Sequence, residues 1–369
     1  MKIVFSSNIS WSIYNFRLSL LKSFQKDGHE IYTVATKDDY SKKLIEEGFN
    51  FEQISLNNNS TNPLEDLKTI YKYYKLYKKI KPDVICHNAI KPNIYGTIAA
   101  GFLGIPTVNN ISGLGTLFIK KSFTTKVAKF LYRFSQKRAT KVFFQNSDDL
   151  NLFIENNLVE ESKCKVIPGS GVDTKRFKPD KNQQKNTKEF KFLFIGRLLF
   201  DKGIREYVEA AKLLKEKYAN VEFNVLGPLY ANNSTSITQN DLDDWVKDKT
   251  INYLGETDKV EEEIKKVDCV VLPSYREGLS KVLIEASSMA LPIVTTNVPG
   301  CKDVVVNNET GFLCEARSSD SLLLSMDKML NLTATERDLM GEKARERAIK
   351  VFDQEIIINH YKNAIYSIV

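Results

Sequence analysis

The sequence is poor in the residues that build disulfide frameworks and metal centres. It has five cysteines and three histidines in 369 residues. The cysteines are odd in number, widely spaced and without a C-x-x-C pair, so neither a disulfide framework nor a zinc site is supported. Asp241 and Asp243 form an Asp-x-Asp pair, but they open a polar helix and are interpreted as helix N-terminal charge. We therefore expect no metal, no cofactor, and a reducing cytoplasmic environment.

Long hydrophobic runs are also missing. The longest candidate, Ile94–Ile105, is interrupted by glycines and falls short of the roughly 18 apolar residues that a membrane-spanning helix needs. The chain runs from Met1 directly into a predicted strand, so we expect no signal peptide. The composition is that of a globular protein, and the length suits two domains.

Positive charge is in excess, with a net charge of +7, and it gathers in two stretches of the first half. Lys68–Lys81 is basic and rich in tyrosine, and Lys120–Lys141 alternates cations with aromatic residues. Either stretch is explained by a solvated helix face or by peripheral association with the anionic inner face of the plasma membrane. No nucleic-acid-binding motif accompanies them, so nucleic acid is not an expected partner.

Strand and helix patterns alternate along nearly the whole chain, which predicts an α/β fold with parallel sheets. The polar stretch from 179 to 188 reads as a linker. We predict two doubly wound Rossmann-like domains, residues 1–180 and 181–353, facing across a cleft. The amphipathic segment 354–369 follows them. Ligands of such sheets bind beyond the carboxyl ends of the strands.

The segment Pro273–Glu285 carries the strongest functional signal. A short apolar strand leads into a turn with Glu277, and a helix begins near Ser280 and carries Glu285. The backbone N–H groups of Gly278, Leu279 and Ser280 are expected to point from the helix N-terminus towards an anion. A carboxylate one turn along can hold a diol such as a ribose. By itself, the pattern also fits a surface loop with two solvated glutamates.

A second glycine turn follows the predicted strand Phe192–Ile195. Gly196 and Arg197 open the turn and Lys202 closes it, so two cations suited to phosphate oxygens flank it. Together with Leu291–Asp303 and Thr310–Leu313, these segments resemble the retaining glycosyltransferases of family 4. The resemblance implies the GT-B fold and a segment 354–369 that crosses back onto the first domain.

The first domain contributes a turn between its first strand and first helix, where Asn8 and Arg17 are candidate ligands of the diphosphate or acceptor. This turn has no glycine, unlike a tight phosphate loop. Ser112 and Gly113 follow another strand, and Ser112 stands where many members of the family have a histidine that touches the donor sugar. His87 ends a strand and is expected to be structural.

The resemblance implies transfer of a hexose or N-acetylhexosamine from a UDP-sugar to a saccharide on polyprenyl diphosphate. Arg197 and Lys202 would hold the diphosphate, Glu277 the donor sugar and Glu285 the ribose, with Leu254 near the base. Two alternatives are a sugar-nucleotide 2-epimerase and a non-catalytic scaffold at the membrane surface. Three scattered histidines make the epimerase a poor fit, because it needs acid–base groups at the sugar.

Overall fold

The computed structural model describes residues 1–56, 63–114, 123–180, 189–230, 233 and 235–369. They form two compact units: unit 1 contains Met1–Ser170 and Gln354–Val369, and unit 2 contains Gly171–Asp353. The boundary lies before the position that the sequence suggested, residue 180. The reason is that Val172 and Phe177 are buried in the core of unit 2.

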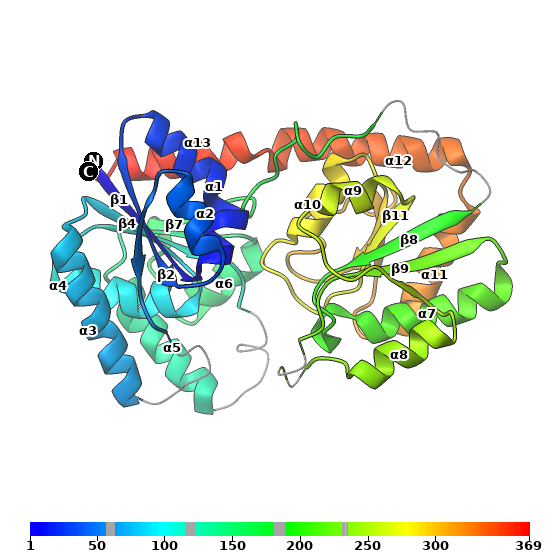
Figure 1. Cartoon of the computed structure of the whole chain (residues 1–369), viewed down its shortest axis with the longest axis horizontal. Coiled ribbons are helices and arrows are strands. Elements are labelled where there is room, and N and C mark those ends of the chain that lie inside the picture. Colours follow the sequence, from blue (N-terminus) through cyan, green and yellow to red (C-terminus); the bar gives the residue numbers. More distant parts are fainter. Residues whose placement is uncertain (57–62, 115–122, 181–188, 231–232, 234) are drawn as a thin grey trace. The chain divides into compact units, whose positions relative to one another are not determined.

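Unit 1 is built on one parallel sheet with the strand order β3-β2-β1-β4-β5-β6-β7 (Figure 1). Its strands are β1 (Lys2–Ile9), β2 (Glu30–Thr36), β3 (Asn50–Gln53), β4 (Val84–Asn88), β5 (Thr107–Ile111), β6 (Lys141–Phe144) and β7 (Cys164–Val166). Its helices are α1 (Ser10–Lys26), α2 (Tyr40–Glu46), α3 (Pro63–Ile80), the π-helix η1 (Pro92–Gly96), α4 (Thr97–Phe102), α5 (Phe123–Gln136), α6 (Ser147–Glu155), the 3-10 turn η3 (Glu161–Lys163) and α13 (Gln354–Tyr366).

Helices cover both faces of this sheet, so successive residues of β1 are buried from Ile3 to Ser7. In β1, Ile3 and Phe5 pack into the core cluster that includes residues of α1 and α13, whereas Val4 packs into the cluster on the opposite face. The second cluster includes Tyr73 and Tyr77 of α3. Alternate residues of β1 therefore pack against helices on opposite faces of the sheet. The last helix of the chain, α13, packs on the same face as α1.

Unit 2 repeats the plan with the strand order β10-β9-β8-β11-β12-β13, again all parallel. Its strands are β8 (Phe190–Ile195), β9 (Val221–Leu226), β10 (Asn252–Tyr253), β11 (Cys269–Leu272), β12 (Ile293–Thr296) and β13 (Gly311–Cys314). Its helices are the 3-10 turn η4 (Phe200–Lys202), α7 (Ile204–Lys217), α8 (Gln239–Lys247), α9 (Val260–Lys265), α10 (Lys281–Ser288), α11 (Ser319–Asn331), α12 (Ala334–Arg347) and the π-helix η5 (Ala348–Phe352).

Each sheet has a topological switch point, where the strand order reverses beside the first strand. In unit 1 the switch lies between β1 and β4, and in unit 2 it lies between β8 and β11. The carboxyl ends of the two strands at such a point diverge into opposite helical layers and leave room for a ligand. The loops after β1, β4, β8 and β11 are therefore the places where binding residues are expected.

The sequence predicted two doubly wound α/β domains, and the two parallel sheets confirm this. It missed α6, β7 and α12. Within the described residues, none of the helices combines the length and hydrophobicity needed to cross a bilayer. Asp241 lies in the first turn of α8 and closes a capping box with Thr238, as expected of helix N-terminal charge.

Candidate active site

The switch point of unit 2 brings together the two motifs of the second half. Lys202 ends the turn after β8, and Glu277 lies in the loop after β11, the neighbouring strand. The Lys202 ammonium donates to the Glu277 carboxylate, and both side chains are largely buried. A cation and a carboxylate that lie more than seventy positions apart in the sequence thus form one ion pair at the strand ends.

The loop after β11 is held at both ends by one neighbouring segment. The N–H of Glu277 donates to the Pro299 carbonyl and that of Ser280 to the Gly300 carbonyl, each at 3.0 Å. Gly300 has a φ of +78°, and a Cβ there would lie 2.5 Å from the carbonyl oxygen of Glu277. The prediction that the Ser280 N–H points to an anion is therefore wrong, because this group is already bonded within the protein.

The same loop leads directly into α10. Ser280 is the N-cap of α10, and its hydroxyl accepts from the N–H of Leu283. Gly278 and Leu279 precede it, and in the described part of the chain the N–H of Leu279 has no hydrogen-bond acceptor. The helix start therefore supplies the N–H of Leu279 as a donor that a ligand can use.

Glu285 lies on α10 and is buried. Its carboxylate is 3.8 Å from the ammonium of Lys281, and Arg176, which is paired with Glu261 at 2.8 Å, also acts on it. Burial raises the pKa of the Glu285 carboxyl to about 7, although Lys281 and Arg176 oppose this shift. A carboxylate with so little solvation gains most from hydroxyl donors, which suits the predicted contact with a ribose.

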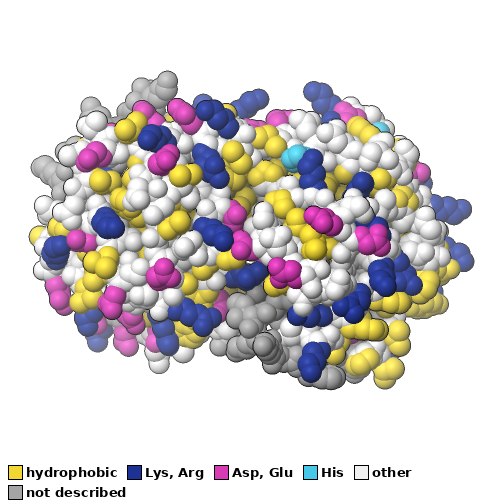
Figure 2. Space-filling view, turned by 180° about the vertical axis from the view of Figure 1, so that it is seen from behind, with side chains coloured by type: hydrophobic (Ala, Val, Ile, Leu, Met, Phe, Trp, Pro, Cys, Tyr) yellow, Lys and Arg dark blue, Asp and Glu magenta, His cyan; other side chains and the backbone are white. Residues whose placement is uncertain are grey.

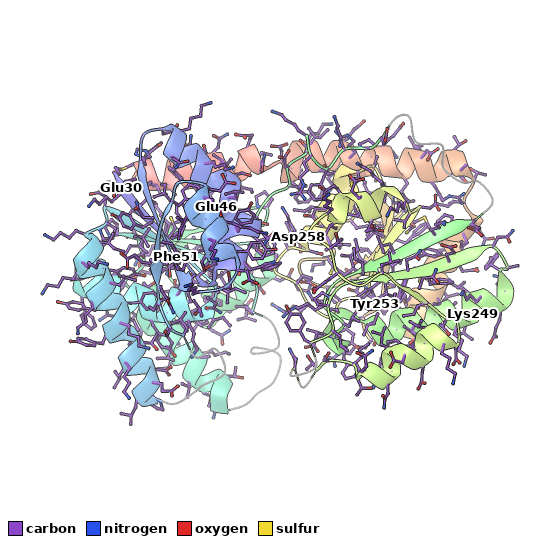
Figure 3. All side chains as sticks on the ribbon, viewed as in Figure 1. Glu30, Glu46, Phe51, Lys249, Tyr253 and Asp258 are labelled. Atoms are coloured by element: carbon purple, nitrogen blue, oxygen red, sulfur yellow. The ribbon has the colours of Figure 1, made fainter. Side chains whose placement is uncertain are left out.

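Arg197, Gly196 and Leu254 lie at the same edge of the sheet. Arg197 is exposed, with its guanidinium 5.8 Å from the ring centre of Tyr230. The N–H of Gly196 donates to the Leu226 carbonyl, so it is not available to a ligand. The residue has no side chain, so a ligand can approach its backbone closely. Leu254 follows β10 and is 42% exposed, next to Tyr253, whose hydroxyl donates to the Gly227 carbonyl at 3.0 Å (Figure 3).

The predicted residues of unit 1 lie at its own strand ends. Asn8, the second-to-last residue of β1, is half-buried, and its Oδ1 has no donor among the described residues. Ser112 is exposed after β5, and Gly113 follows with a φ of +115°. These two residues present a hydroxyl and a compact turn.

Arg17 has a role that its sequence context did not reveal. It is buried, its Nε donates to Asn88 Oδ1 at 3.1 Å, and its guanidinium lies 5.7 Å from the ring centre of Tyr361 on α13. The hydroxyl of Tyr361 in turn contacts Asn110, which donates to it at 2.9 Å. Arg17 thus contacts the end of β4 directly and the end of β5 through Tyr361.

His87 is fully buried, which confirms its structural interpretation. Its Nε2 lies 2.9 Å from the Tyr77 hydroxyl and its Nδ1 lies 2.9 Å from Asn109 Oδ1. Burial lowers the pKa of His87 to about 4, so the ring is neutral at physiological pH. Both nitrogens are occupied, and the ring cannot serve as a ligand for a sugar.

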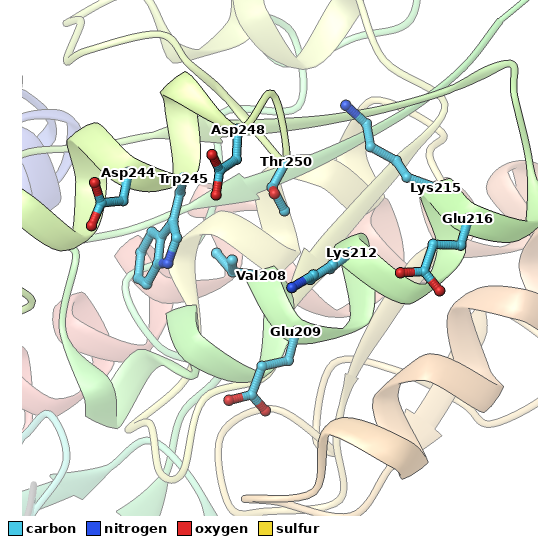
Figure 4. Close-up of a pocket in the computed structure, with 9 residues that line it drawn as sticks. All are labelled: Val208, Glu209, Lys212, Lys215, Glu216, Asp244, Trp245, Asp248 and Thr250. Atoms are coloured by element: carbon cyan, nitrogen blue, oxygen red, sulfur yellow. The ribbon is translucent and has the colours of Figure 1, made fainter.

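A groove of about 670 Å³ lies elsewhere on unit 2, between α7 and α8 (Figure 4). Trp245 lies in it beside Lys212, and Glu209, Asp244 and Asp248 flank it. None of the residues that line this groove is among the predicted site residues.

Comparison with known proteins identifies the family of the chain. Residues 175–347 match the family model described as "Glycosyl transferases group 1", and residues 2–146 match one described as "Glycosyl transferase 4-like". The first model contains every site residue of unit 2, and the second contains those of unit 1. The chain is a GT-B glycosyltransferase.

Relatives of this glycosyltransferase carry consistent names. It is 28% identical to the N,N'-diacetylbacillosaminyl-diphospho-undecaprenol alpha-1,3-N-acetylgalactosaminyltransferase of Campylobacter jejuni, with 98% of this chain and 97% of the relative covered. It is 29% identical to the UDP-Gal:alpha-D-GlcNAc-diphosphoundecaprenol alpha-1,3-galactosyltransferase of Escherichia coli, with 79% of this chain and 78% of the relative covered. Among solved structures, Anabaena HepE in complex with UDP and glucose superposes with a TM-score of 0.82 at 18% identity, with full coverage of both chains.

The structure of the glycosyltransferase adds groups that the sequence did not single out. The carbonyls of Pro299 and Gly300 accept hydrogen bonds from the loop that carries Glu277. Burial raises the pKa of Glu285, and the charges of Lys281 and Arg176 lower it in part. The Val-Pro-Gly sequence gave a signal for these hydrogen bonds, because glycine is the residue that tolerates the positive φ found at Gly300. The pairing of Arg176 with Glu261 joins segments far apart in sequence and left no local signal.

Proposed function

We propose that this glycosyltransferase moves a hexose or N-acetylhexosamine from a UDP-sugar to a saccharide carried on polyprenyl diphosphate, with retention of the anomeric configuration. The observation that carries the proposal is the Lys202–Glu277 pair at the switch point of unit 2, beside the start of α10. The relatives in Campylobacter jejuni and Escherichia coli support the acceptor class, because their names specify sugars on diphospho-undecaprenol. The Escherichia coli name and the HepE complexes support UDP.

Different residues of unit 2 bind different parts of the UDP-sugar. Lys202 and Arg197 neutralise the diphosphate, and the N–H of Leu279 adds a donor at the helix start. Glu285 accepts from the ribose hydroxyls, and Glu277 accepts from a hydroxyl of the transferred sugar. The acceptor hydroxyl oxygen bonds to the anomeric carbon as the bond from that carbon to the diphosphate breaks. UDP leaves with the electron pair, and the hydroxyl proton passes to the departing phosphate oxygen.

The leaving diphosphate needs positive charge, and two cations of this chain supply it. Groups placed in advance at the position where charge develops contribute several kcal/mol to a transition state. We propose that Lys202 and Arg197 fill the role that a divalent metal fills in other transferases. Turnover is accordingly expected to persist in EDTA. Loss of turnover in EDTA that added Mn²⁺ or Mg²⁺ restores would contradict this part of the proposal.

The main test is release of UDP from a panel of UDP-sugars, with and without a polyprenyl-diphosphate-linked saccharide. A transferase releases UDP rapidly only when the acceptor is present, together with a product enlarged by one sugar. Release of UDP with an epimerised free sugar and no enlarged product would indicate the epimerase. Absence of UDP binding in calorimetry would leave the scaffold.

A lipid-linked acceptor keeps its chain in the bilayer, and α5 offers a surface that fits the headgroup region. Val127, Phe130 and Phe134 are exposed on this helix, while Ala128 and Tyr132 are buried on its other side. Lys126 is exposed on the same helix, whereas Lys129 is bound to Asn156. On the face shown in Figure 2, Lys/Arg and Asp/Glu side chains are intermingled.

We propose that α5 rests on the anionic inner leaflet, with Phe130 inserted and Lys126 at the headgroups. Lys120 and Lys121, the first cations of this stretch, lie outside the described residues. Sedimentation with anionic liposomes should succeed at low salt and decline at high salt, as screening grows. The double variant Lys126→Glu/Phe130→Ser should stay in the supernatant, with UDP affinity unchanged. Continued sedimentation of this variant would exclude α5 and leave α3, with exposed Leu64 and Leu67, as the next surface.

A further inference from the structure

Two loops and the first turn of α7 meet around the side chain of Tyr275, which lies two residues before Glu277. The Tyr275 hydroxyl donates to Glu206 Oε1, from the first turn of α7. On Tyr275, the guanidinium of Arg317, from the loop after β13, lies 4.7 Å from the ring centre. Burial, and then the bond to Glu206, raises the pKa of the Tyr275 hydroxyl, so it stays a donor.

Glu206 has an unusual environment for a helix-surface carboxylate. It is 9% exposed, and its Oε2 atom is enclosed with no donor among the described residues. Burial of a carboxylate with one oxygen unsatisfied is costly. A neutral residue at this position would avoid that cost, so the carboxylate serves a purpose other than packing.

The contact from Tyr275 to Glu206 joins the same two segments that carry Lys202 and Glu277. The Asp201 carbonyl accepts from the N–H of Tyr275 at 2.9 Å and from the hydroxyl of Ser274 at 3.1 Å. A Cβ on Gly203 would lie 2.1 Å from the Pro273 carbonyl oxygen, so the two backbones touch. The turn after β8 and the loop after β11 are thus locked together on one side of the Lys202–Glu277 pair.

We infer that Glu206 is a positioning residue for glycosyl transfer, acting through Tyr275 to hold the loop of Glu277 against the turn of Lys202. The inference rests on the function proposed above for those two residues. Without the contact, the loop keeps its backbone bonds to Asp201 but gains freedom to tilt, and Glu277 loses its fixed place relative to Lys202. A misplacement of about 1 Å at reacting groups costs up to about 100-fold in rate.

The test compares Tyr275→Phe, Glu206→Ala and Glu206→Gln with the wild type. Tyr275→Phe and Glu206→Ala are expected to lower kcat about tenfold, with the UDP dissociation constant changed less than about threefold. Glu206→Gln keeps an acceptor for the tyrosine and is expected to retain at least about half of kcat. Glu209→Ala, one turn further along α7 and exposed, is the matched control and should behave as wild type.

Two further measurements separate positioning from general destabilisation. In a Glu277→Gln background, Tyr275→Phe should lower kcat by less than about twofold, because the group it positions is already gone. Amine-reactive labelling needs no turnover: Lys202 should be modified faster in Tyr275→Phe than in wild type, with Lys212 unchanged. Unaltered kcat together with unaltered Lys202 labelling would overturn the inference. A wild type that transfers no sugar, yet shows the labelling difference, would refute the proposed function and leave the contact intact.

Discussion

The two sheets have the same topology, but their carboxyl edges differ in chemistry. Around the switch point of unit 2 stand Lys202, Glu277 and Glu285, two of them joined in an ion pair. The corresponding edge of unit 1 presents Asn8 and Ser112, and its buried interior is a network of amides and a neutral histidine. The one arginine predicted for a ligand there, Arg17, is buried against Asn88 and Tyr361.

This difference indicates a division of labour. Charged groups that are partly buried stabilise a diphosphate strongly, and amides and hydroxyls suit the hydroxyl groups of an uncharged saccharide. The fold therefore supplies the position of a site, and the side chains at the strand ends decide its ligand. On this proposed division, substitutions in unit 2 should impair binding and use of the nucleotide-sugar, and substitutions in unit 1 should impair use of the acceptor.

The largest effect is expected for Lys202→Ala. This change removes the cation proposed to stabilise the leaving diphosphate and leaves Glu277 without its partner, so kcat/KM for the donor should fall roughly 100-fold or more. Arg197→Ala should cost less, because its exposed guanidinium is screened by water. Steady-state kinetics measures both, with Lys212→Ala as a control on an exposed lysine of α7. Near-normal kinetics for Lys202→Ala would contradict the assignment of diphosphate binding to unit 2.

Glu277→Gln should rank second, with kcat reduced roughly 30-fold. The UDP dissociation constant should stay the same or fall, because loss of the carboxylate charge releases Lys202 for phosphate oxygens. Stopped assays of transfer and calorimetry with UDP give the two numbers. Weaker UDP binding with normal turnover would mean that Glu277 serves the nucleotide and not the sugar.

Glu285 should make UDP binding dependent on pH near 7. Its raised pKa of about 7 means that this carboxyl, the proposed ribose ligand, is ionised at pH 8 and mostly protonated at pH 6. The ratio of the UDP affinity of the wild type to that of Glu285→Gln should then fall about tenfold from pH 8 to pH 6. The ratio cancels the titration of UDP itself. A ratio independent of pH would show that the carboxylate does not contact the nucleotide in its ionised form.

The same carboxyl affects stability in the opposite direction. Its pKa is higher in the folded chain than the ordinary 4.5, so the folded state binds this proton more tightly than the unfolded state does. The contribution to stability is complete below pH 4.5 and is lost as pH rises through about 7. Glu285→Gln should therefore gain stability relative to wild type at pH 8, which denaturant unfolding would reveal.

The smallest effect is expected in unit 1. Asn8→Ala should lower kcat/KM for the acceptor by about threefold to tenfold, because a single neutral hydrogen bond contributes about 1 kcal/mol. UDP affinity should not change. Asn15→Ala, on an exposed position of α1, is the control. Weakened UDP binding by Asn8→Ala would place diphosphate contacts on both sheets and weaken the division.

The sequence predicted the sheets and the charged site because their signals are local. Apolar runs marked the buried strands, and a glycine turn or a glutamate directly after a run marked Lys202 and Glu277. The strand β7 was missed because it is only three residues long and lies at the sheet edge. The helix α12 was missed because it is polar almost all round, with only Met340, Gly341 and Ala344 buried.

The hydrogen-bond partners of the site residues were not predictable from one sequence. Whether the N–H of Ser280 points to a ligand depends on a carbonyl twenty positions away, at Gly300. Whether Arg17 binds phosphate depends on Tyr361, near the other end of the chain. Local patterns cannot show such partners, because they are brought together only by tertiary packing.

The position of α13 has a consequence for how the protein is made. Ile357, Ile358, Tyr361 and Ile365 complete the same core as Ile3, Phe5 and Phe143. While the ribosome is still producing Gly171–Asp353, that face of the first sheet is covered by α1 but lacks α13, for on the order of ten seconds or more at usual elongation rates. The nascent first half is therefore an incomplete fold that chaperones would bind, and truncation before Gln354 should yield an aggregation-prone chain.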